Sequence, residues 1–169
     1  FTWTAVMQQV EAGKIDLDAD VNTYLDFKIP LKDGKPVTMR QLMTHTSGFE
    51  EHGKLTMFDD PKFQISLGDL VKGGVPNRIY AAGSTPSYSN YGTALAGYIV
   101  ERVTKMSFDD YVEQRIFQPL GMAGSTFRQP LPKAFAPWMA TGYRQLSTGP
   151  YKFEIVGPSP AGGLASTGA

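Results

Sequence analysis

Apolar residues recur with the period of an α-helix in three stretches of the chain. They are Trp3, Val6, Met7 and Val10 in the first stretch, Ala94, Leu95, Tyr98, Ile99 and Val103 in the second, and Phe108, Tyr111, Val112 and Ile116 in the third. Residues three and four apart lie on one face of a helix. We therefore predict three amphipathic helices, the second starting at Asn90 and the third starting at Ser107 and ending near Pro119 and Gly121.

Shorter elements are marked by capping and turn residues. Thr38 followed by Gln41 is typical of a capping box, and predicts a short helix that ends near His45. Ser66 predicts the start of another short helix, which Gly73 and Gly74 end. Asp33-Gly34 indicates a tight turn between extended segments.

Beyond residue 124 the pattern changes from helical to extended. Residues 140–146 and 151–156 read as strands on either side of a turn at 147–150, and residues 161–167 read as a strand that approaches a new helix. The sequence contains no internal repeat and no linker between domains, so we predict a single α+β domain over residues 1–169. It has a helical region at 1–124 and the start of a sheet region at 125–169. The helical stripe begins at once, so we expect both ends to be truncated.

Composition and charge narrow the function classes. The 169 residues are 41% hydrophobic and 12% aromatic, which is typical of a folded domain. Sixteen basic residues balance sixteen acidic ones without a like-charged block, so we expect no nucleic-acid partner. No apolar run is long enough for a membrane span. The absence of cysteine excludes disulfides and thiol catalysis within this sequence.

Tyr88 and Asn90 are the candidate catalytic residues. Serine hydrolases need a proton acceptor beside the nucleophile, and a phenol can serve as one. If residues 88–90 form a loop before a helix, both side chains can project in one direction. The alternative, which residues 88–90 by themselves favour, is an aromatic-rich helix start in which Asn90 is an ordinary N-cap. Tyr80, Tyr88 and Tyr91 could also line a groove for a peptide or glycan, and packing explains these tyrosines equally well.

The two histidines have less distinctive surroundings. His45 could act as a general base for Ser47, but an imidazole near a helix end also serves by bonding free carbonyls, and we favour that structural role. His52 follows Glu50 and Glu51, yet one histidine with two flexible carboxylates is a weak metal site. We assign no metal and no cofactor.

Four segments together resemble one protein family. They are Phe1 to Gln9, His45-Thr46-Ser47-Gly48-Phe49, Tyr88-Ser89-Asn90-Tyr91-Gly92 and Pro119-Leu120-Gly121-Met122. They are similar to segments of the serine β-lactamase and penicillin-binding protein superfamily, in its branch of class C-like esterases, D-aminopeptidases and FmtA-like proteins. The resemblance spans nearly the whole sequence, which would make up about half of a complete catalytic domain.

The resemblance implies a helical region packed beside an antiparallel sheet, with the first helix central and buried. It also implies that Tyr88 is the general base, assisted by a lysine, and that Asn90 contacts the substrate or the lysine. Tyr80 and Tyr91 remain substrate-binding candidates.

The first and third catalytic motifs of the family are missing from the sequence. No serine is followed three residues later by lysine, and no Lys-Thr-Gly or His-x-Gly triplet occurs. We therefore expect the chain to be inactive by itself, or to be a non-catalytic binding or oligomerising module. Expected ligands are a small acyl compound, a β-lactam or a cell-wall peptide. We expect a homodimer formed through the surface that a sheet would cover, and family resemblance suggests a periplasmic or secreted location.

Overall fold

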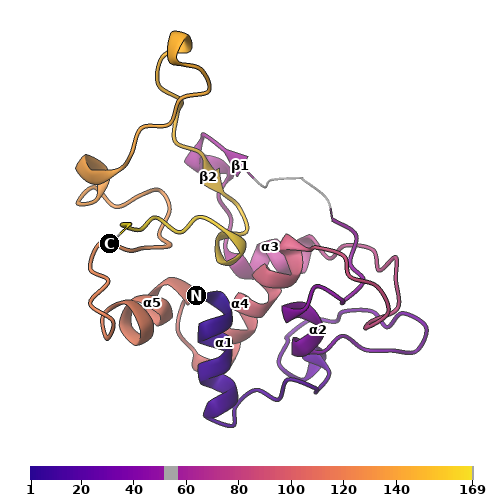
Figure 1. The fold of residues 1–169 in the computed structure, drawn as a ribbon. Helices are drawn as coiled ribbons and strands as arrows, with labels where there is room; N and C mark the ends of the chain where they lie inside the picture. Colours follow the sequence, from indigo (N-terminus) through magenta and orange to yellow (C-terminus); the bar gives the residue numbers. More distant parts are fainter. Residues whose placement is uncertain (52–56, 169) are drawn as a thin grey trace.

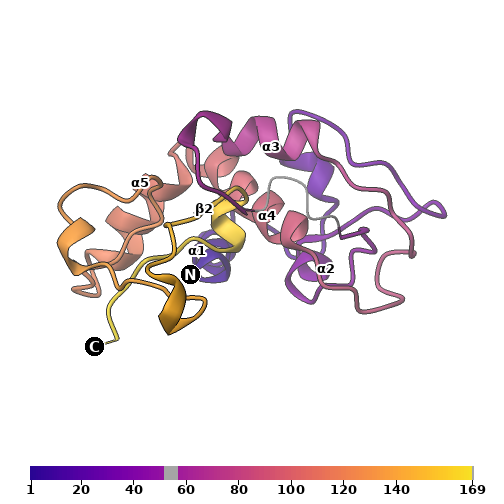
Figure 2. The same cartoon turned by 90° about the horizontal axis from the view of Figure 1, so that it is seen from above.

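The chain forms an α+β structure in which one long helix is central. The computed structural model describes residues 1–51 and 57–168. The α-helices are α1 (Thr2–Glu11), α2 (Met39–Met43), α3 (Leu67–Gly73), α4 (Asn90–Thr104) and α5 (Phe108–Val112). Helix α4 packs against the other four, and it lies between α1 and α3 in both views (Figures 1 and 2). None of the helices among the described residues is long and apolar enough to cross a membrane.

The predicted helix starts are confirmed by their capping hydrogen bonds. The Thr38 hydroxyl accepts a hydrogen bond from the Gln41 backbone N–H, and the Gln41 side chain accepts one from the Thr38 N–H. The Ser66 hydroxyl caps α3 by accepting from the Asp69 N–H, and the Ser107 hydroxyl caps α5 by accepting from the Asp110 N–H. These caps satisfy N–H groups that have no partner within their helix, which explains why local sequence identifies them.

Helix α1 buries part of the apolar stripe that its spacing indicates, together with two polar residues. Its buried residues are Thr2, Ala5, Val6 and Gln9, whereas Met7 is 43% exposed. Of the predicted stripe, Val6 is buried, Trp3 and Val10 pack against the core, and Met7 is exposed. Two polar side chains take the interior positions because each has a partner there. Thr2 donates to the Pro160 carbonyl (2.5 Å), and Gln9 donates to the Tyr111 hydroxyl (2.6 Å).

The described sheet is small and pairs segments that are far apart in sequence. Strand β1 (Met57–Phe58) runs antiparallel to β2 (Ile155–Val156), with Met57 opposite Val156. The strand predicted at 140–146 is not formed, and the one predicted at 151–156 is reduced to its last two residues. Residues 140–145 are exposed, and this part of the chain extends away from the helices (Figure 1). Strand-like residues without a neighbouring strand have no ladder to join.

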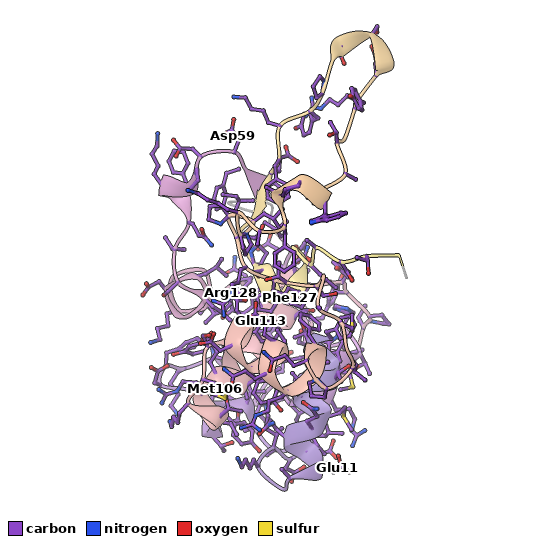
Figure 3. All side chains as sticks on the ribbon, turned by 90° about the vertical axis from the view of Figure 1, so that its left-hand side faces the viewer. Glu11, Asp59, Met106, Glu113, Phe127 and Arg128 are labelled. Atoms are coloured by element: carbon purple, nitrogen blue, oxygen red, sulfur yellow. The ribbon has the colours of Figure 1, made fainter. Side chains whose placement is uncertain are left out.

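A charged cluster joins the helical region to the segment that follows it. The Arg128 guanidinium donates to Glu113 and to Asp110, and Figure 3 shows Arg128 and Glu113 beside each other. These two carboxylates raise the pKa of Arg128. The cluster borders a surface pocket of about 580 Å³ that is also lined by Phe117 and Met122. Because the carboxylates already neutralise Arg128, this pocket offers no free positive charge to an anion.

Candidate active site

Tyr88 lies two residues before Asn90, the first residue of α4, and the two side chains lie on the same side. Ser89 is extended and buried, and its hydroxyl accepts a hydrogen bond from the Gly92 N–H (3.1 Å). Ser89, and not Asn90, is therefore the N-cap. Tyr88 is 60% exposed, and its hydroxyl donates to Oδ1 of Asn90 (3.2 Å). The two side chains therefore lie side by side, as their spacing allows.

His45 supports this segment from the end of α2. Its Nδ1 accepts a hydrogen bond from the Ser89 N–H (3.2 Å), and its carbonyl accepts one from the Ser87 N–H (2.7 Å). Its ring lies against the Tyr88 ring, with 4.5 Å between the ring centroids. His45 thus holds the backbone and the aromatic ring of the candidate base, which agrees with a structural role.

A pairing of His45 with Ser47 is not present. Ser47 is 1% exposed, and its hydroxyl has no hydrogen-bond partner among the described residues. The acceptor nitrogen of His45 is occupied by the Ser89 N–H. Without a hydrogen bond between the two side chains, the reading of His45 as a base for Ser47 has no geometric support.

Glu51 binds Asn90 through both carboxylate oxygens. Oε2 accepts a hydrogen bond from the Asn90 backbone N–H (2.9 Å), and Oε1 accepts one from Nδ2 of Asn90 (2.8 Å). A negative charge is favoured at this place because Asn90 opens α4, where the helix dipole is positive. In the sequence Glu51 is a candidate only for a weak metal site, and nothing there indicates its contact with Asn90. No local pattern links residues that lie 39 positions apart.

The other two tyrosine candidates have different surroundings. Tyr80 is partly exposed, and its backbone N–H donates to the Gly48 carbonyl (3.3 Å). Tyr91 is buried, donates to the Val71 carbonyl (2.8 Å) and packs edge-on against Phe49. Burial raises the pKa of Tyr91. As a core residue, Tyr91 is not placed to line a groove, and packing accounts for it; Tyr80 remains a candidate.

The described residues do not form a metal-binding cluster. Residues 1–51 and 57–168 contain no group of three or more His, Asp or Glu side chains that could hold an ion. His52 lies outside these ranges, so its surroundings are not described. Among the described residues, the candidate site consists of Tyr88 and Asn90. His45 contacts Tyr88, and Glu51 accepts hydrogen bonds from Asn90.

Comparison with known proteins gives one consistent result. The family model Beta-lactamase matches residues 1–169. Putative penicillin-binding protein PbpX of Bacillus subtilis (strain 168) is 28% identical over 141 residues, which are 83% of this chain and 33% of that protein. Lovastatin esterase of Penicillium rubens is 30% identical over 151 residues, covering 75% of this chain and 37% of the esterase.

A solved structure agrees with these sequence matches. The octameric penicillin-binding protein homologue from Pyrococcus abyssi superimposes with a TM-score of 0.77 at 26% identity. The match covers 98% of this chain and 40% of that one. The chain therefore spans about a third of the length of the two curated relatives.

Proposed function

The chain belongs to the Beta-lactamase family, and from this premise we propose that it carries the second catalytic motif of a β-lactamase-related serine hydrolase. In this proposal Tyr88 is the general base that activates a serine nucleophile, and Asn90 contacts the substrate or a catalytic lysine. The reaction is acyl transfer from an ester, a β-lactam or a D-amino peptide. We also propose one partial domain, with its helical region at 1–124 and its sheet region starting at 125.

One observation carries this proposal. The Tyr88 hydroxyl is exposed and lies 3.2 Å from Oδ1 of Asn90, directly before the central helix. A phenol becomes an effective base when a neighbouring positive charge favours its phenolate form. A hydroxyl with this exposure and a fixed partner can approach both a lysine and a serine. Packing alone does not require such a group on the surface.

We predict that the 169-residue chain alone does not hydrolyse esters. The sequence has no Ser-x-x-Lys motif, and loss of a nucleophile removes several orders of magnitude of rate. The test compares hydrolysis of a p-nitrophenyl ester by this chain and by the complete gene product at equal concentration. Turnover by the complete gene product, with this chain at the buffer rate, supports the proposal. Turnover by this chain at the rate of the complete gene product overturns it.

A non-catalytic binding or oligomerising module is the second candidate. It is favoured by the absence from these residues of both the Ser-x-x-Lys motif and a Lys-Thr-Gly or His-x-Gly triplet. A fluorescent penicillin applied to the complete gene product separates the two candidates. A covalent label that survives denaturation requires a nucleophile and supports the hydrolase, whereas reversible binding alone supports the module.

We further propose that the chain alone associates with itself as a dimer. Support comes from large apolar side chains that stay exposed, among them Met7 on α1, Leu120 after α5 and Trp138, which is 85% exposed. Large exposed apolar patches are usually buried against another protein surface, and a symmetric dimer is the commonest assembly that buries them. Light scattering at micromolar concentration should give about twice the chain mass of 18.5 kDa. A constant monomer mass across that range would contradict the dimer.

A further inference from the structure

The side-chain amide of Asn90 has its two ends facing different partners. Its Nδ2 donates to Oε1 of Glu51 (2.8 Å), and its Oδ1 accepts from the Tyr88 hydroxyl (3.2 Å). A carboxylate accepts hydrogen bonds and donates none, so only the nitrogen end of the amide can face Glu51. The oxygen end is thereby turned toward Tyr88.

Glu51 also fixes the backbone of the same residue. Its second oxygen, Oε2, accepts the Asn90 backbone N–H (2.9 Å), which has no acceptor within α4 because it lies in the first turn. Two hydrogen bonds to one carboxylate restrict both the position and the rotation of the Asn90 side chain. Charge-assisted bonds of this kind are stronger than neutral ones.

We propose that Glu51 is a positioning residue for the Tyr88–Asn90 pair. It acts through Asn90 by turning Oδ1 toward Tyr88, and so supplies the acceptor that orients the Tyr88 hydroxyl. This inference rests on the proposed function of Tyr88. It assigns Oδ1 of Asn90 as the acceptor of the Tyr88 hydroxyl, and it leaves the second N–H of Nδ2 as the remaining donor of this side chain.

Replacement of Glu51 by Gln tests the orientation with little change of shape. The Gln side chain presents an NH₂ group and an oxygen, so it can face either end of the Asn90 amide, and the preference for one orientation is lost. Glu51→Ala removes both hydrogen bonds. Glu50→Gln is the matched control, because Glu50 carries the neighbouring carboxylate and bonds Nδ2 of Asn77 (3.1 Å) instead of Asn90.

Steady-state kinetics of the complete gene product give the first readout. We expect Glu51→Gln to lower kcat about 10–100-fold with KM changed by less than about twofold, because misplacement affects the chemical step more than binding. Glu50→Gln should leave both constants within about twofold. Equal effects of the two Gln variants would overturn the positioning role.

Hydrogen exchange at the Asn90 backbone amide gives a second readout that needs no activity. We expect the amide to exchange at least about tenfold faster in Glu51→Ala than in the wild type or in Glu50→Gln, since a first-turn N–H has no other partner. Unchanged exchange would overturn the inference while leaving the proposed function intact. If Tyr88→Phe has no effect on activity, the proposed function fails, and the positioning role fails with it.

Discussion

Replacing Tyr88 by Phe in the complete gene product is expected to lower kcat/KM for a p-nitrophenyl ester by about 10²–10⁴-fold, the usual contribution of a positioned acid–base group. The substitution removes the hydroxyl that donates to Asn90 and keeps the ring that packs against His45. Because Tyr88 is exposed, the substitution should change the free energy of unfolding by no more than about 0.5 kcal/mol. Initial rates at several substrate concentrations, with thermal unfolding, measure both effects.

Tyr143→Phe is the control for that experiment. Tyr143 is also an exposed tyrosine, and residues 139–145 lie on the far side of the molecule from α2 in Figures 1 and 2. Its hydroxyl has no part in the proposed chemistry, so kcat/KM should remain unchanged. If both variants lose the same activity, or if neither does, Tyr88 is not the general base.

The second large effect is expected from Gly48→Ala, which should destabilise the protein by about 2–5 kcal/mol. Gly48 has a φ of +81°, a left-handed conformation that L-residues disfavour. An added Cβ would lie 2.1 Å from the backbone oxygen of Tyr80. The Gly48 carbonyl accepts hydrogen bonds from Ile79 and Tyr80, so the two segments cannot separate without losing them. Urea unfolding of the complete gene product measures the change in free energy of unfolding.

Gly34→Ala separates the two causes of this effect. Gly34 also has a positive φ, +72°, but an added Cβ there would meet nothing within 4 Å. Its cost should therefore be the conformational part alone, about 1–2 kcal/mol. An excess of at least about 1 kcal/mol in Gly48→Ala reports the contact with Tyr80. Equal losses in the two variants would show that this contact is not tight in solution.

Features set by neighbouring residues were predictable from sequence. The capping box at Thr38 and Gln41 and the serine caps of α3 and α5 depend on residues within one turn of each other. The turn at Asp33-Gly34 likewise has positive φ at both residues. The common direction of Tyr88 and Asn90 followed from their spacing and from the loop that precedes α4.

Features set by distant partners were not predictable. The buried face of α1 depends on Pro160 and Tyr111, which give Thr2 and Gln9 hydrogen-bond partners in the interior. The contact of Glu51 with Asn90 joins two segments by packing, and neither segment contains a signal for it. The predicted strand at 140–146 does not form, because residues with strand propensity form a strand only when a neighbouring strand pairs with them.

We propose that these 169 residues supply the base motif of a serine hydrolase and lack its nucleophile. The most direct test is the intact mass of the purified chain before and after incubation with a β-lactam and a p-nitrophenyl ester. We expect about 18.5 kDa in every sample, with no covalent adduct. A stoichiometric adduct on this chain would contradict it, because a nucleophile would then be present among these residues.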